Sequence, residues 1–246
     1  MTELLVPAWP APTNVRALQT LRTGGCSPAP WDSFNLGNHV GDSPALVAAN
    51  RAMLRERLPA EPLWLQQVHG ITAVNADFEA NLLEADAAIA RQPGRVCTVM
   101  TADCLPVLLC DRAGTLVAAA HAGWRGLVAG VLEATIKKMD VPASELLAWL
   151  GPAIGPNCFE VGDEVRATFV DKDPDAALAF LATSPGKWLA DIYTLARQRL
   201  QTAGVNSISG GNFCTFTEAE RFFSYRRDGV TGRMASLIWL DHQSGV

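Results

Sequence analysis

The sequence has little of the residues that mark several classes of protein. Of its 246 residues only four are histidine and six are cysteine, and 25 acidic residues outnumber 20 lysines and arginines. A net charge of −5 without basic clusters argues against a nucleic-acid-binding protein. No apolar run is long enough to span a membrane. Residues 1–5 have neither a basic lead nor an apolar core, so we expect no signal peptide and a cytoplasmic protein.

The scarcity of cysteine and histidine also limits the disulfides and metal sites that the chain can form. Without an export signal, six cysteines favour free thiols or metal ligands over disulfides. The histidines are His39, His69, His121 and His242, so a metal site has very few combinations available.

Apolar residues, by contrast, are abundant. They make up 49% of the chain against 18% charged residues, which is ample for a large core. Neither a repeat nor a linker-like tract divides the sequence, so we predict one domain over residues 1–246. Helical and strand patterns are mixed without regular βαβ alternation. This favours an α+β fold, a mixed β-sandwich with flanking helices.

The spacing of apolar residues and the positions of turn residues predict the helices and strands. Helices are expected over residues 43–58, 125–139, 163–170 and 191–203, and strands over 63–68, 71–75, 95–100, 105–110, 115–120, 222–226 and 234–240. Arg51 falls on the apolar stripe of the first helix, where a guanidinium needs an acceptor or an anion. Snorkelling to the surface, or pairing with a core carboxylate, is the alternative.

Cys104 and His121 are the first candidates for chemistry. If residues 105–110 and 115–120 pair as a hairpin, both side chains emerge at its open end. A thiol and an imidazole held together form either a thiolate–imidazolium dyad or part of a metal site. His69, in a similar turn, offers a third ligand, and a Cys/His/His set leaves one tetrahedral position open. A structural cysteine and two hydrogen-bonded histidines fit the spacing equally well.

Two arginines lie at positions suited to anions. Arg125 opens a helix directly after the turn that follows His121, and Arg226 lies beside a turn near the C-terminus. Ordinary salt bridges are the alternative for both. The glycine-rich segments 151–156 and 210–212 match neither a Walker loop nor a dinucleotide-binding fingerprint.

Several motifs occur in order along nearly the whole chain. They are Ser33-Phe34-Asn35-Leu36, His39-Val40-Gly41-Asp42, Asn50-Arg51, Gln67-Val68-His69-Gly70, Ala85-Asp86-Ala87, Thr101-Ala102-Asp103-Cys104-Leu105-Pro106, His121-Ala122-Gly123-Trp124-Arg125-Gly126 and Phe223-Ser224-Tyr225-Arg226-Arg227-Asp228. In these motifs the sequence resembles the laccase-domain family, also called the YfiH or polyphenol oxidase family, and most of all its bacterial single-domain members.

This resemblance implies a function and a site. It implies a mixed β-sandwich similar in topology to the catalytic domain of a deamidating bacterial toxin, a Cys–His hydrolase. It implies His69, Cys104 and His121 as catalytic metal ligands, with zinc as the metal and copper as a possibility. It also implies phosphorolysis of adenosine, inosine and methylthioadenosine, with adenosine deamination. The chain departs from many members at Asn157, Cys158 and Phe159, where those have paired cysteines and a tyrosine.

The leading hypothesis is therefore a zinc-assisted purine nucleoside phosphorylase and deaminase, with a purine nucleoside and inorganic phosphate as substrates. Arg51 is the first phosphate candidate, followed by Arg125 and Arg226; Asn35 would bind base or ribose and Phe34 would stack on the base. Three alternatives stay open: a copper phenol oxidase, a metal-free hydrolase or amidase with Cys104 as nucleophile and His121 as base, and a non-enzymatic nucleoside-binding module. A homodimer is expected on base rates alone.

Overall fold

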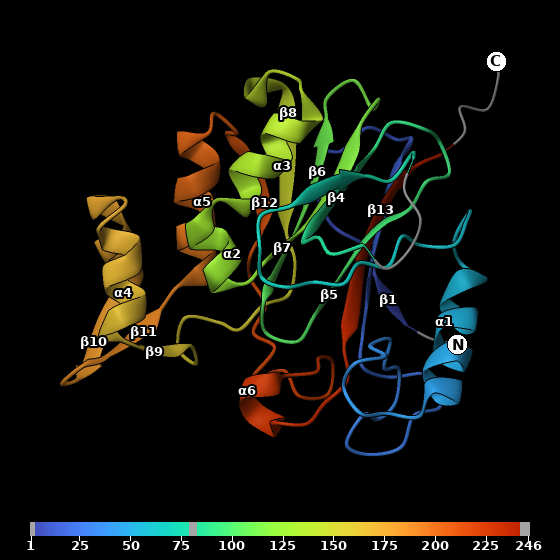
Figure 1. Ribbon diagram of the computed structural model, residues 1–246, viewed down its shortest axis with the longest axis horizontal. Helices are drawn as coiled ribbons and strands as arrows, with labels where there is room; N and C mark the ends of the chain where they lie inside the picture. The colour runs from blue at the N-terminus through green and yellow to red at the C-terminus, as the bar shows by residue number, and fades with distance from the viewer. Residues whose placement is uncertain (1–2, 79–82, 242–246) are drawn as a thin grey trace.

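Two β-sheets stacked face to face form the centre of the molecule (Figure 1). The computed structural model describes residues 3–78 and 83–241, so His242 lies outside the described residues. The four-stranded sheet has the order β1 (Leu4–Leu5), β2 (Val15–Thr20), β13 (Met234–Leu240) and β5 (Cys97–Thr101). The six-stranded sheet has the order β12 (Ser207–Gly210), β8 (Leu146–Leu150), β6 (Leu105–Asp111), β7 (Val117–Ala122), β4 (Ala87–Ala90) and β3 (Ala73–Asn75).

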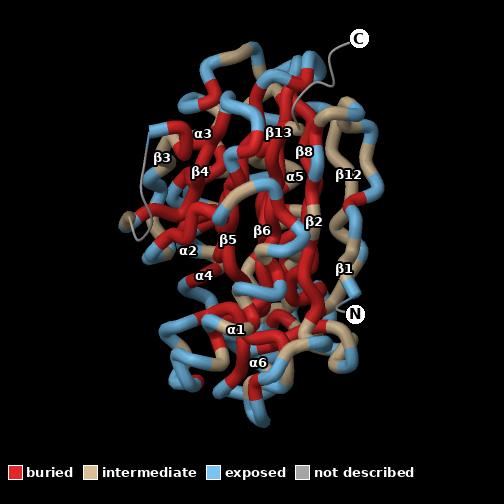
Figure 2. The backbone as a smooth tube through the Cα atoms, turned by 90° about the vertical axis from the view of Figure 1, so that its right-hand side faces the viewer, coloured by how far each residue is buried: buried red, intermediate tan, exposed pale blue. Residues whose placement is uncertain are grey.

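The main core lies on both faces of the six-stranded sheet. Successive side chains of a strand point to opposite faces, and β6 follows this rule. Leu108 and Cys110 pack toward the four-stranded sheet, whereas Val107 and Leu109 join the cluster under the helices. Because both faces are covered, β6 has no polar face, and Figure 2 shows β4, β5, β6 and β13 buried along most of their length.

Helices cover the outer faces of the two sheets. Leucines and valines of α2 (Trp124–Ala129), α3 (Val131–Met139) and α5 (Ile192–Thr202) pack on the six-stranded sheet. On the other side α1 (Pro44–Arg55) packs on the four-stranded sheet through Leu54. These layers confirm the predicted α+β sandwich with flanking helices; the likeness to a toxin domain stays a prediction.

The remaining elements form a small third sheet and short helices. The third sheet has the order β10 (Phe180–Ser184), β11 (Lys187–Ala190) and β9 (Glu160–Gly162), and it projects to one side with α4 (Asp163–Val170) and the 3₁₀ helix η2 (Pro174–Ala179) (Figure 1). The short helices are η1 (Ala143–Glu145) and α6 (Tyr225–Asp228). Among the described residues, no helix has the length and apolar character needed to cross a membrane.

Most predicted elements are confirmed. α4 has the predicted bounds, and α5 begins after Asp191, whose carboxylate accepts hydrogen bonds from the backbone N–H groups of Tyr193 and Thr194. The predicted hairpin is β6 paired antiparallel with β7.

Four expectations were wrong in detail. The helix over 125–139 is two helices, because Gly130 between them takes the left-handed conformation, φ 110°. The first helix ends at Arg55 rather than at residue 58. Residues 222–226 are not a strand, since the Ser224 hydroxyl accepts the N–H of Arg227 and starts α6 there. Residues 63–68 make only isolated bridges, which pair Leu63 with Cys97 and Gln66 with Glu84.

Candidate metal centre

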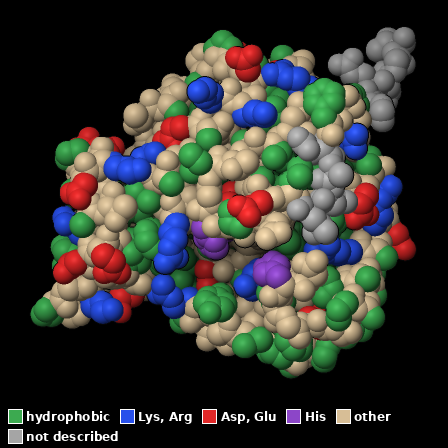
Figure 3. All heavy atoms as spheres, viewed as in Figure 1, with side chains coloured by type: hydrophobic (Ala, Val, Ile, Leu, Met, Phe, Trp, Pro, Cys, Tyr) green, Lys and Arg blue, Asp and Glu red, His purple; other side chains and the backbone are tan. Residues whose placement is uncertain are grey.

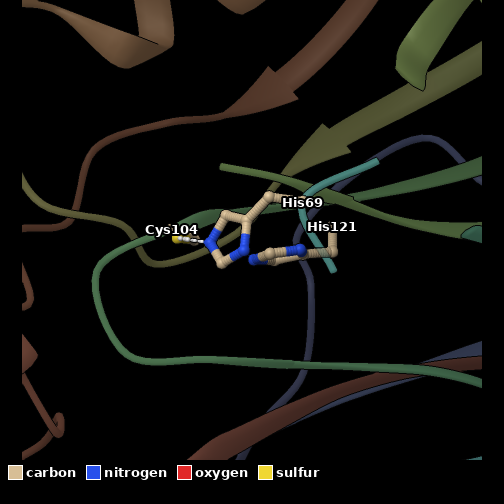
Figure 4. Close-up of side chains that lie close together, drawn as sticks. All are labelled: His69, Cys104 and His121. Atoms are coloured by element: carbon tan, nitrogen blue, oxygen red, sulfur yellow. Dashed lines mark hydrogen bonds between the residues drawn. The ribbon is translucent and has the colours of Figure 1, made fainter. Parts of the chain in front are cut away.

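Three segments bring His69, Cys104 and His121 together. His121 is on β7, and the β6–β7 register places it opposite Pro106, two residues after Cys104. His69 is on a turn that precedes β3. The expectation that Cys104 and His121 emerge at the same end of the hairpin is confirmed, with His69 beside them (Figure 4).

The three side chains are close enough to share an ion. The Cys104 thiol lies 3.6 Å from Nε2 of His69. The His69 and His121 rings meet edge to face, with centroids 4.7 Å apart. One potential ligand atom from each residue lies within 4.8 Å of the others. His121 is buried, Cys104 is half-buried and His69 is exposed, so the cluster is reached by solvent at His69.

Asp86 orients His121 from behind. This buried carboxylate accepts a hydrogen bond from Nδ1 of His121 at 2.8 Å. Since an ionised carboxylate can only accept, the proton lies on Nδ1 and Nε2 is left as the ligand atom. Burial alone would raise the pKa of Asp86, but the hydrogen bonds from His121 and from the Gly70 and Val68 N–H groups bring it below its ordinary value.

The same carboxylate holds the turn that carries His69. The backbone N–H groups of Val68, His69 and Gly70 donate to Asp86 at 3.2, 3.0 and 2.6 Å. His69 itself has φ 60°, a conformation that a side chain with a Cβ rarely adopts. One acid therefore fixes two of the three potential ligands, one through its ring and one through its backbone.

Cys104 is positioned by the residue before it. Asp103 has φ 88°, and its carboxylate accepts the Thr215 hydroxyl and the Arg226 N–H, both at 2.6 Å. Strained backbone of this kind persists where the surroundings over-determine it, and it is concentrated at functional sites. The Cys104 turn is thus tied to the C-terminal part of the chain.

A glycine allows the thiol and the imidazole to approach. A Cβ on Gly123 would lie 2.7 Å from Cδ2 of His69 and 3.0 Å from the Cys104 sulfur. Any side chain at this position would displace both potential ligands.

Protonation in the cluster favours an anionic thiol. Burial raises the pKa of Cys104, but His121 and His69 outweigh it and lower that pKa to about 6. Burial lowers the pKa of His121, but the Cys104 and Asp86 charges raise it to about 9. At neutral pH the cluster without a metal is therefore a thiolate beside an imidazolium.

The donor set fits a transition-metal ion. A thiolate and two imidazoles are ligands for zinc, and they suit copper as well. Ligands of tetrahedral zinc at their usual bond lengths lie about 3.5 Å apart, which agrees with the 3.6 Å between Cys104 and His69. With three protein ligands one position stays open, the arrangement of a catalytic rather than a structural site.

Arg233 interacts with the Cys104 turn, and Arg233 and Arg51 both interact with His39. Burial and then the charges of Arg233 and Arg51 lower the pKa of His39. Burial also lowers the pKa of Arg233, while the negative charges of Cys104 and Asp103 oppose this. Arg233 therefore interacts with both the Cys104 turn and His39. On the face drawn in Figure 3, two histidine side chains lie beside a hollow, each with lysine or arginine side chains nearby.

The predicted phosphate arginines differ in their surroundings. Arg51 stacks on Trp64, with its guanidinium carbon 3.9 Å from the ring centroid, and donates two hydrogen bonds to the Leu36 carbonyl. Arg125 is exposed and lies over Trp124. Arg226 donates to the Glu160 carbonyl at 2.9 Å. Of the three, only Arg51 acts on His39.

Two predicted substrate contacts need correction. Phe34 is fully buried in the core under α1, so no base can stack on it. Asn35 is also fully buried. Its amide donates to Gly37 and Asp42, and its oxygen accepts the N–H groups of Gly37 and Arg233. Asn35 therefore positions the Arg233 backbone instead of binding base or ribose.

Sequence reasoning gave no role to Asp86, Asp103 or Arg233. A signal existed for Asp86, because an acid among alanines at the start of a buried strand needs a partner. Nothing local distinguishes Arg233 from other arginines, since its neighbourhood is created by the tertiary fold.

The chain is similar to a known protein family along nearly its whole length. The model of a family described as multi-copper polyphenol oxidoreductase laccase matches residues 16–241. Purine nucleoside phosphorylase PA4543 of Pseudomonas aeruginosa is 58% identical over 241 residues, which cover 98% of this chain and 99% of that protein. Purine nucleoside phosphorylase YfiH of Escherichia coli is 56% identical over 243 residues, which cover 98% and 100%.

Solved structures agree with the fold. Neisseria meningitidis protein NMB0706 has a TM-score of 0.94 at 52% identity, covering 97% of this chain and 99% of that one. YlmD of Geobacillus stearothermophilus has a TM-score of 0.89 at 30% identity, covering 98% and 99%.

Proposed function

The chain belongs to the multi-copper polyphenol oxidoreductase laccase family, and from this premise we propose that it is a metal-dependent purine nucleoside phosphorylase. The substrate class comes from the names of its relatives. The observation that carries the proposal is the cluster of His69, Cys104 and His121, which is exposed at His69 and has the positive charge of Arg233 beside the Cys104 turn.

Phosphorolysis needs an anion beside the ribose. An oxygen of inorganic phosphate forms a bond to C1′ while the bond from C1′ to N9 breaks, and the purine leaves with the electron pair and takes up a proton. Arg233 supplies positive charge beside the Cys104 turn. Arg233 and Arg51 both act on His39, whose pKa is lowered first by its burial and then by these two charges. We propose this region as the phosphate subsite, with Arg226 and Arg125 at its margin.

His69, Cys104 and His121 would hold the metal, zinc in this proposal and copper as the alternative. Bound there, the ion would supply Lewis acidity that stabilises negative charge as it develops on the substrate. Asp86 keeps the Nδ1 proton of His121 in place and fixes the His69 turn. Asp103 holds the Cys104 turn through Thr215 and the Arg226 backbone.

The finer assignments belong to the same site. We propose adenosine, inosine and methylthioadenosine as nucleosides that are cleaved to base and ribose 1-phosphate or its methylthio form. We propose adenosine deamination at the same centre. The single domain over residues 1–246, a cytoplasmic location and a homodimer remain predictions.

Two other functions each have an observation in their favour. The family description and the Cys/His/His ligand set favour a copper-dependent phenol oxidase. However, a multicopper enzyme needs a histidine-rich cluster to reduce oxygen, and this sequence has four histidines in all. The lowered pKa of Cys104 beside His121 favours a metal-free Cys–His hydrolase. The product analysis described next distinguishes this hydrolase from the phosphorylase.

The test is product analysis by mass spectrometry. The zinc-loaded protein and its Cys104→Ala variant are each given adenosine, with and without phosphate. We expect adenine and ribose 1-phosphate only when phosphate is present, and a loss of at least about 100-fold in the variant, beyond the 10–100-fold usual for residues behind a ligand. Inosine as the only product would make the protein a deaminase. If adenosine is not converted either with or without phosphate, the proposal is rejected in favour of the hydrolase.

A further inference from the structure

A cleft with a volume of about 470 Å³ is lined by two cysteines that the proposed function does not use. Cys158 and Cys214 both line it and are both partly exposed. Tyr193, Arg197 and Glu218 line it as well. None of His69, Cys104 and His121 does, so the cleft is a separate feature of the molecule.

The Cys214 sulfur lies among hydrogen-bond donors. The Gly155 N–H donates to it at 3.3 Å. The Thr217 hydroxyl and the backbone N–H groups of Phe216 and Thr217 also lie near the sulfur and favour its anionic form. Such a nest of N–H groups stabilises an anion. Burial alone would raise the pKa of Cys214, but these donors, Thr217 first among them, bring it below its ordinary value.

The turn around this cysteine is firmly built. The Glu218 carboxylate accepts the Cys214 N–H at 2.8 Å, and the Glu218 N–H donates back to the Cys214 carbonyl at 2.9 Å. One residue on, Thr215 is anchored to Asp103. The sulfur is therefore held in its nest by contacts on both sides.

Cys158 comes to the same point from another segment. A turn closed by its N–H and the Gly155 carbonyl, 3.0 Å apart, brings its thiol near enough to Cys214 for that residue to affect its pKa. Burial, and then the neighbouring Cys214, raise the pKa of Cys158. A Cβ on Gly155 would lie 2.9 Å from Cβ of Cys214 and 3.0 Å from its sulfur, so only glycine allows this approach.

The two sulfurs are thus unequal. The lowered pKa of Cys214 favours its thiolate form, whereas the raised pKa of Cys158 favours its protonated thiol. Thiol–disulfide exchange makes use of such a difference in pKa, since the thiolate attacks first and a neighbouring thiol completes the exchange.

We propose that Cys214 and Cys158 form a thiol pair that is reversibly oxidised to a disulfide by low-molecular-weight disulfides entering the cleft. The Cys214 thiolate attacks one sulfur of the small disulfide, whose S–S bond breaks and releases one thiolate. Cys158 gives its proton to that thiolate and attacks the Cys214 sulfur, which releases the second thiolate. The pair loses two electrons, and the small disulfide is reduced to two thiols once the second thiolate takes a proton from water.

The test uses the full chain and a neutral probe, bis(2-hydroxyethyl) disulfide, because the cleft carries charges of both signs. After exposure, remaining thiols are alkylated with iodoacetamide and the peptides are mapped by mass spectrometry. We expect a Cys158–Cys214 cross-link that dithiothreitol reverses. In the Cys158→Ser variant the reaction should stop at a mixed disulfide on Cys214. In the Cys214→Ser variant, Cys158 should be modified at least about tenfold less than in the wild-type protein.

The alkylation rates of individual cysteines in the wild-type protein give a second test that does not depend on these variants. At limiting iodoacetamide and neutral pH, we expect Cys214 to react faster than Cys26, which is exposed. Thr217→Val removes the hydroxyl donor, so the Cys214 rate should fall about threefold to tenfold. Thr183→Val, on exposed strand β10, should not change it. Absence of the cross-link in the wild type, or a Cys214 rate no higher than that of Cys26, would overturn the proposal. Neither result bears on the metal centre.

Discussion

Cys104 and Cys214 are two thiols whose pKa values are lowered by different neighbours. Imidazoles surround the Cys104 sulfur, whereas N–H groups and a hydroxyl surround the Cys214 sulfur. Imidazole nitrogens carry lone pairs and can share a cation with the thiolate, but N–H groups point positive ends at the sulfur and repel one. The neighbours therefore decide whether a thiolate is suited to bind a metal or to act as a nucleophile.

The two sites also share a feature. A glycine lies against each thiol, Gly123 at the metal centre and Gly155 at the thiol pair, and each would bring a Cβ to 3.0 Å from the sulfur. Close approach of a second segment is thus required at both. This similarity gives a matched pair of variants.

Gly123→Ala should have the largest effect. Its Cβ would displace His69 and Cys104 together, so we expect zinc affinity to fall at least about 100-fold, as for a direct disturbance of ligands. Competition with a chromophoric chelator measures this. Gly155→Ala is the control, with unchanged zinc affinity but slower formation of the Cys158–Cys214 cross-link. Equal zinc affinity in the two variants would contradict the assignment of Gly123 to the metal centre and Gly155 to a separate site.

Asp86→Asn should have a smaller effect on the same affinity. The amide keeps an acceptor oxygen but loses the charge that favours the protonated Nδ1 of His121, and we expect a loss of about 10–100-fold. The control is Asp77→Asn. Asp77 is also a buried carboxylate, and it accepts the backbone N–H groups of Arg91 and Gln92 away from the cluster. A similar loss in both variants would mean that the effect arises from general destabilisation.

Local patterns were enough to predict part of this structure. The hairpin of β6 and β7, helices α4 and α5 and strand β13 follow from alternation, caps and turns within a few residues. The closeness of Cys104 and His121 follows from that hairpin. The addition of His69 rested on similar turn context and on the family resemblance, since no local pairing joins it to the hairpin.

The remainder depends on contacts between distant segments. Asn35 was expected to face a substrate, but the fold uses all its hydrogen-bonding groups to join two loops and the Arg233 backbone. The nest around Cys214 combines residue 155 with residues 216 and 217, and no periodicity predicts that meeting. Residues 222–226 have a strand-like composition, yet the Ser224 cap decides for a helix.

The smallest predicted effect is a difference in pH profiles of the metal-free protein. The Cys104 pKa falls from 9.0 to about 6, so its contribution to stability is present above pH 9 and lost as the pH falls toward 6. The His121 pKa rises from 6.5 to about 9, so its contribution is present below pH 6.5 and lost as the pH rises through 9. Between these limits the folded and unfolded pairs bind the same number of protons, and their effects on the pH dependence of stability cancel.

The rate of alkylation at Cys104 should therefore be nearly flat, changing less than about twofold between pH 7 and 8.5, whereas an ordinary thiol with a pKa of about 8.5 gains more than about tenfold. Cys214 has donors but no imidazole, so we expect its rate to rise at lower pH than that of the urea-unfolded chain. Iodoacetamide labelling in EDTA, read peptide by peptide, gives both profiles from one sample. A Cys104 rate that follows the unfolded chain would show that the imidazoles do not stabilise its thiolate, and the contrast between the two sites would be lost.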